Sequence, residues 1–125
     1  MPEETLPSNL QNFIAQNVRS VEQLEILLLV ARDRETDWTV QMVYDAILST
    51  KPSVERWLDE FTRLGFLRKV TADLVIYRFA ARGETTGLIQ DLGDLYKTKP
   101  VRVIEAIFRG DRARAPGASL PQRRK

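Results

Sequence analysis

Residues 39–80 read TVQMVYDAILSTKPSVERWLDEFTRLGFLRKVTADLVIYRFA, and this stretch decides the fold. Thr39 is a suitable N-cap for a helix over residues 40–48, in which apolar side chains recur at helical spacing. Pro52 suits the first position of a second helix, because its ring fixes φ near the helical value. Gly65 follows that helix, where a left-handed cap conformation is needed. The sequence therefore predicts two helices joined by a tight turn.

Two short strands are predicted after the second helix, at residues 66–71 and 74–80. In the second of them, Val75, Tyr77 and Phe79 alternate with Ile76 and Arg78, which is the period of a strand. The residues between the strands, Thr71-Ala72-Asp73, form the bend. The segment is thus expected to close with a compact antiparallel hairpin.

This element order resembles the winged helix-turn-helix transcription regulators of bacterial type, broadly MarR-like or PadR-like. The resemblance rests on the Trp38-Thr39 entry, the serine-led turn into SVERWLDEFTRLGFL, and Phe66-Leu67 after the glycine. It implies that helix 52–64 lies in the major groove of DNA and that hairpin 66–80 touches the flanking backbone as the wing. It also implies that helices outside the motif form a dimer.

Two further helices are predicted before the motif, after a flexible N-terminus at residues 1–7. Ser8 with Gln11 fits a capping box, and Ser20 with Gln23 repeats it. The second of these helices is apolar nearly all round, so we expect it to be the buried centre of the fold.

A helical pattern resumes after the hairpin, from about Glu84, and Pro100 gives it a kink or a fresh start. Residues 109–125 are rich in glycine, proline and arginine and are expected to be a basic disordered tail. The expected fold is therefore mainly α with a small antiparallel β-hairpin: one winged-helix domain over residues 8–108, with C-terminal dimerisation helices.

The composition argues against catalysis. The chain of 125 residues contains no cysteine and no histidine, which removes thiolate metal ligands, disulfides and the commonest general base. Its carboxylates are scattered, without a phosphate-binding loop or nucleophile motif beside them. We therefore predict no enzyme, no catalytic or metal-binding residues and no cofactor. The longest apolar run, residues 26–31, is too short for a membrane span, and we expect a cytoplasmic protein.

Charge is distributed unevenly along the chain. Residues 1–50 carry three basic and eight acidic side chains, whereas residues 51–82 carry seven basic and four acidic ones. Residues 83–108 have three basic and four acidic, and residues 109–125 have six basic and one acidic. Positive charge therefore collects on the second helix of the motif, the hairpin and the tail, where a polyanion would be met.

The candidate DNA contacts lie on the outer face of helix 52–64, on the turn before it and on the hairpin. Arg56 is suited to a bidentate contact with guanine, and Ser53 to a phosphate near the start of the helix. Basic and hydroxyl side chains of the hairpin are suited to phosphate contacts. The full predicted set for double-stranded DNA is Lys51, Ser53, Arg56, Arg63, Lys69, Thr71 and Arg78.

Three carboxylates on the same helix face support an alternative function. Glu55, Asp59 and Glu60 would repel the DNA backbone, or form ion pairs on a solvated face, such as Asp59 with Arg63. In this alternative, the chain is a winged-helix protein–protein interaction module without DNA binding.

The apolar stripe after the hairpin has two alternative fates. It packs on the chain's own helix around Ile14, or it pairs with a second copy. Because a domain of this size has little room to bury every amphipathic helix, we favour a homodimer, and the sequence identifies no small-molecule effector. The predicted dimer interface is Leu88, Leu92, Leu95, Tyr96, Val103 and Ile107.

Overall fold

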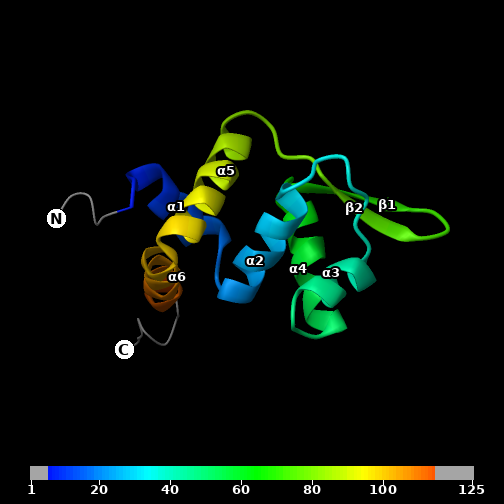
Figure 1. The fold of residues 1–125 in the computed structure, drawn as a ribbon, viewed down its shortest axis with the longest axis horizontal. Helices are drawn as coiled ribbons and strands as arrows, with labels where there is room; N and C mark the ends of the chain where they lie inside the picture. Colours follow the sequence, from blue (N-terminus) through cyan, green and yellow to red (C-terminus); the bar gives the residue numbers. More distant parts are fainter. Residues whose placement is uncertain (1–5, 115–125) are drawn as a thin grey trace, which may run out of the picture. The chain divides into compact units, whose positions relative to one another are not determined.

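The computed structural model describes residues 6–114, and it is mainly helical with one two-stranded antiparallel hairpin (Figure 1). This agrees with the predicted class. The elements are, in order, α1 (Ser8–Asn17), α2 (Val21–Ala31), α3 (Val40–Ala46), α4 (Lys51–Arg63), β1 (Leu67–Thr71), β2 (Val75–Phe79), α5 (Gly83–Thr98) and α6 (Pro100–Arg114).

The chain divides into two compact units. The first, here called the terminal unit, contains residues 6–21 and 90–114 of the described chain. The second, here called the hairpin unit, contains residues 22–89 and with them the whole predicted DNA-binding motif.

The terminal unit is built on the packing of α1 against α6. The inward face of α1 is fully apolar, as its spacing predicted, with Leu10, Phe13, Ile14 and Val18 all buried. A Cβ added at Gly110 of α6 would lie 3.4 Å from the Cα of Ala15, so the glycine permits a close approach of the two helices.

Two predictions for this unit were wrong. Ser8 is not a cap: it is the first residue of α1, Pro7 takes the cap position, and Gln11 donates its side-chain NH to the Leu6 carbonyl at 2.8 Å. In addition, α6 continues through Arg114, into the predicted tail. The arginines and alanine here favour a helix, and α1 gives that helix a surface to pack on. The rest of the predicted tail and residues 1–5 lie outside the described residues.

In the hairpin unit, α2 forms part of the core, with Leu24, Ile26, Leu27 and Val30 fully buried. The predicted burial is confirmed for these four residues, whereas Leu28, Leu29 and Ala31 are half-buried. No helix in the described part of the chain is both long enough and apolar enough to span a bilayer.

The two predicted helices joined by a tight turn form nearly as expected. The Thr39 hydroxyl caps α3 by accepting from the Met42 amide at 3.1 Å, and the Thr50 hydroxyl caps α4 by accepting from the Ser53 amide at 3.2 Å. However, α3 ends at Ala46, two residues before the predicted end. Leu48, the last residue of the predicted helix, instead lies in the turn and is fully exposed.

The end of α4 is fixed by a glycine in the left-handed region. Gly65 has a φ of +88°, and its amide donates to the Thr62 carbonyl at 3.0 Å. The Phe66 amide donates to the Phe61 carbonyl at 2.9 Å, and the two aromatic rings lie 6.1 Å apart. This pair of hydrogen bonds with an accompanying apolar contact is a Schellman motif, which turns the chain from α4 directly into β1.

The hairpin pairs β1 with β2 in a register that places Lys69 opposite Tyr77 and Arg68 opposite Arg78. A third segment joins it, because the Trp38 amide and carbonyl exchange hydrogen bonds of 2.8 and 2.7 Å with Tyr77. The entry to α3 is therefore held against the second strand. β1 also packs on α4, and the hairpin projects from the helices of its unit (Figure 1).

Candidate nucleic-acid interface

One side of α4 is open to solvent along its length. The opposite side of the helix is buried. It carries Val54, Leu58 and Phe61, which recur at the three- and four-residue spacing of a helix and are fully buried. The residues along the open side line a shallow depression formed by this helix alone: Pro52, Glu55, Arg56, Asp59, Glu60 and Arg63. We call these six residues the α4 strip.

Two predicted cations on this helix lie on aromatic rings. The Arg56 guanidinium is 5.0 Å from the centre of the Trp57 ring, and the Lys51 ammonium is 5.4 Å from that of Tyr44. Both cations remain exposed. Stacking on an aromatic face orients an arginine without using its hydrogen-bond donors. The Arg56 guanidinium therefore keeps the N–H groups that would donate to O6 and N7 of a guanine.

The other two predicted contacts on α4 already have carboxylate partners. The Ser53 hydroxyl donates to Glu22 of α2 at 2.8 Å, and the Ser49 hydroxyl donates to the same oxygen. Arg63 donates from Nε to Glu60 at 3.0 Å, which raises the pKa of the arginine. The predicted pairing of Arg63 with Asp59 is therefore wrong, because Asp59 is engaged elsewhere.

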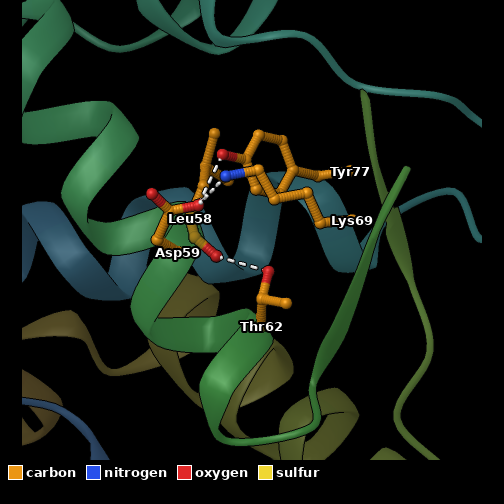
Figure 2. Close-up of polar contacts among 5 residues, drawn as sticks. All are labelled: Leu58, Asp59, Thr62, Lys69 and Tyr77. Carbon is orange, nitrogen blue, oxygen red and sulfur yellow. Dashed lines mark hydrogen bonds and ion pairs between the residues drawn. The ribbon is translucent and has the colours of Figure 1, made fainter. Parts of the chain in front are cut away.

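Asp59 joins α4 to both strands of the hairpin. Figure 2 shows Lys69 of β1 and Tyr77 of β2 converging on this carboxylate, with Lys69 Nζ at 2.9 Å and the Tyr77 hydroxyl at 2.7 Å from Oδ1. The same view shows Thr62 donating to the Leu58 carbonyl at 2.9 Å, one turn along the helix. We call Asp59, Lys69 and Tyr77 the hairpin clasp.

The clasp shifts the pKa of each of its members. Burial alone would raise the pKa of Asp59, but the hydrogen bonds from Tyr77 and Lys69 and the lysine charge together lower it. Burial, followed by the hydrogen bond to Asp59 and its charge, raises the pKa of Tyr77 to about 12. The hydrogen bond to Asp59 raises the pKa of Lys69. The clasp is therefore an ionised carboxylate held by a charged lysine and a neutral phenol near neutral pH.

The remaining hairpin contacts are Arg78 and Thr71. Arg78 donates from Nε to Oδ1 of Asp37 at 2.8 Å and lies 2.6 Å from the same oxygen through Nη2. That hydrogen bond raises the pKa of the arginine. Thr71 is exposed at the end of β1, next to the bend. Of the seven predicted contacts, the structure thus brings Lys51, Arg56 and Arg63 together on α4, whereas it ties Ser53, Lys69 and Arg78 to carboxylates on other segments.

Sequence reasoning missed the partners that organise this surface. Tyr77 was assigned only to a strand, and no role was predicted for Asp37. Their contacts join residues 18 and 41 positions apart in the chain, and nothing in local periodicity indicates such pairs. The one available signal was the single aromatic hydroxyl on the inward side of a strand, since a buried Tyr hydroxyl usually has a hydrogen-bond partner.

The predicted dimer interface divides into two groups. Leu92, Val103 and Ile107 are fully buried in the single chain, so in this conformation they belong to its core. Leu88, Leu95 and Tyr96 are half-buried. The most exposed apolar residues of α6 are Val101 and Phe108, which lie two turns apart on one face.

Comparison of the chain with protein-family models, with curated proteins and with solved structures found no match. Within residues 6–114, no three His, Cys, Asp or Glu side chains gather in a way that could hold a metal ion.

Proposed function

We propose that this chain is a DNA-binding transcriptional regulator of winged-helix type, with α4 in the major groove and the hairpin on the flanking backbone. The observation that carries the proposal is the solvent-exposed side of α4, a helix of 13 residues, beside a hairpin clasped to the same helix. A major groove about 12 Å wide admits a helix of this kind. The resemblance in element order, the backbone bridge between Trp38 and Tyr77 and the Schellman turn into β1 support it.

In this arrangement Arg56 reads a base edge. Its position on the open side, its exposure and its stacking on Trp57 suit it to a bidentate contact with guanine. The carboxylates of the α4 strip do not all act as free charges, because Asp59 is satisfied by the clasp and Glu60 by Arg63. Glu55 is the carboxylate of the strip that is suited to accept from a cytosine amine.

Gel mobility shift on a pool of genomic fragments, at low and at moderate salt, tests this function directly. Selective retention of a few fragments is the expected result. Arg56→Ala should then weaken binding to the selected fragment by about 1–3 kcal/mol and relax the preference for it. Arg82→Ala removes the same charge outside α4 and the hairpin and should leave the preference unchanged. Binding no tighter than that to random DNA would overturn the proposal.

A second candidate function is a winged-helix protein–protein interaction module without DNA binding. It is favoured by the composition of the α4 strip, in which three of six residues are carboxylates, and by exposed apolar side chains nearby in sequence, Leu48 in the turn and Leu74 at the hairpin bend. Under this function, the purified chain forms a stoichiometric complex with one protein, nuclease treatment does not change it, and Leu48→Ser weakens it.

We also propose that the regulator acts as a homodimer, which would present two α4 helices about one turn of DNA apart to a roughly palindromic site. Support comes from Val101 and Phe108, which are 63% and 56% exposed on one face of α6. If a second copy joins the two side chains into one apolar patch, that patch is of the kind that marks a protein–protein interaction site.

A further inference from the structure

The hairpin carries three cations, and its register separates them onto two faces. Side chains directly opposite each other in an antiparallel pair point to the same face. Lys69 and Tyr77 therefore share the face that contacts α4, and Arg68 and Arg78 share the other face. The sequence suited all three cations to phosphate contacts, although only Lys69 and Arg78 belong to the predicted set of DNA contacts.

Lys69 and Arg78 both join the hairpin to other segments of its unit. Lys69 belongs to the clasp and donates to Asp59 of α4. Arg78 places two guanidinium nitrogens on one oxygen of Asp37, in the segment that leads to Trp38 and α3. A phosphate that took either cation would displace a carboxylate that is hydrogen-bonded to it, and would leave two like charges close together.

Arg68 has no such partner. Its side chain is exposed, and no hydrogen bond, ion pair or ring contact engages it within residues 6–114. Its cross-strand neighbour is Arg78, and like charges directly opposite each other destabilise a hairpin. Asp37 offsets the charge of Arg78, so the charge of Arg68 is the one left unbalanced on this face.

We propose that Arg68 is the phosphate-binding residue of the hairpin, whereas Lys69 and Arg78 position the hairpin against α4 and against the entry to α3. The ligand is a phosphodiester of the DNA backbone, so this inference rests on the proposed function and names the residue that carries it out on the wing. Arg68 binds the phosphate without an exchange of partners, and it contributes one unit of counterion release.

The test compares variants that remove the same charge from adjacent residues on opposite faces. Binding of a fluorescent duplex is followed by anisotropy from about 50 to 200 mM salt, for the full chain and for Arg68→Gln and Lys69→Gln. Arg68→Gln should lower the slope of log affinity against log salt by about 0.9 at unchanged thermal stability. Lys69→Gln should keep the slope and lower the melting temperature, because it breaks the clasp.

A gain-of-affinity variant completes the experiment. Asp37→Asn releases Arg78 beside Arg68, and should raise the slope by about 0.9. Asp91→Asn makes the same charge change on α5 and should leave the slope unchanged. Equal loss of slope in the two hairpin variants, or no gain from Asp37→Asn, would overturn the assignment of Arg68 alone. No binding by the unmutated chain would overturn the proposed function and this inference with it.

Discussion

Asp59 is the residue on which the orientation of the hairpin depends, because two strands donate to one of its oxygens. Tyr77 is fully buried, so its hydroxyl donates to Asp59 instead of to water. We predict that Tyr77→Phe lowers the free energy of unfolding by about 1 kcal/mol, and that Asp59→Ala lowers it by about 1–3 kcal/mol because it leaves the buried hydroxyl unpaired.

Urea denaturation of the two variants and of their double mutant measures these values. The double mutant should be less destabilised than the sum of the single changes, since the shared hydrogen bond is lost only once. Tyr44→Phe is the matched control: this half-buried tyrosine makes only a ring contact with Lys51, so removal of its hydroxyl should change little. Equal effects of the two Tyr→Phe changes would contradict the role of the clasp.

The raised pKa of Tyr77 predicts a loss of stability at alkaline pH. The unfolded chain releases the phenol proton near pH 10, whereas the folded chain holds it to about pH 12. Between these values the folded state binds more protons, so the free energy of unfolding falls as pH rises through this window. Below the window the contribution of Tyr77 is fully present and does not vary with pH. Lys69, whose pKa is also raised, acts in the same direction.

Denaturation at several pH values, with tyrosinate absorbance as a second readout, measures this loss. Tyr77→Phe should remove the part of the alkaline loss that comes from the phenol, together with the tyrosinate signal that titrates last. An unchanged alkaline loss in that variant would contradict the raised pKa of Tyr77.

At the scale of elements, the end of α4 depends on the left-handed conformation of Gly65. A Cβ added at Gly65 meets no atom within 4 Å, and neither does one added at Gly87 in the helical interior of α5. The two sites therefore differ in backbone conformation and not in space. Gly65→Ala should destabilise the chain by about 1–2 kcal/mol, because φ is +88° there. Gly87→Ala should stabilise it by about 0.5–1 kcal/mol.

Thermal melting of the two alanine variants in one buffer measures both effects. Only the direction in which each melting temperature moves, relative to the unmutated chain, needs to be compared. Gly65→Ala should also move β1, which follows the cap directly, and so weaken DNA binding more than its effect on stability explains. A melting temperature that changes in the same direction for both variants would contradict the Schellman assignment.

The elements that sequence predicted well are those with local signals. Thr39, Pro52 and Gly65 each mark a boundary through their own backbone or capping chemistry, and the structure places the boundaries within a residue or two. The predictions that were wrong depend on neighbours distant in the chain. α6 extends past residue 109 where it has α1 to pack on, and Ser8 lies within α1 where a cap was expected.

In the candidate site, too, local features were predictable and contacts between distant residues were not. The open side of α4 was predictable, because burial of Val54, Leu58 and Phe61 follows from their spacing. The sequence did not show which cations of the hairpin are paired with a carboxylate. The pairing depends on Asp59 and Asp37, which contact the hairpin from other segments of the chain. Sequence therefore indicated which residue types face outward, but could not distinguish a free arginine from a clasped lysine.

At the scale of the whole molecule, charge is separated within one unit. The hairpin unit holds nine basic and eleven acidic side chains, yet residues 51–82 within it hold seven basic and four acidic. The unit as a whole therefore gives no general attraction for a polyanion, so the proposed function requires DNA to approach α4 and the hairpin in a defined orientation. Binding to random DNA should accordingly be weak at physiological salt.

The final prediction concerns assembly, and it uses two adjacent residues of α6 that differ in exposure. Phe108 is 56% exposed, whereas Ile107 is fully buried. If the exposed face pairs with a second copy, Phe108→Ala should shift the chain from dimer to monomer in sedimentation equilibrium without lowering the stability of the monomer. Ile107→Ala should instead lower the free energy of unfolding by about 2–5 kcal/mol, because it leaves a cavity. A chain that sediments as a monomer at every concentration would contradict the dimer. A dimer unaffected by Phe108→Ala would have its interface elsewhere, and the half-buried Leu88, Leu95 and Tyr96 of α5 would be the next residues to test.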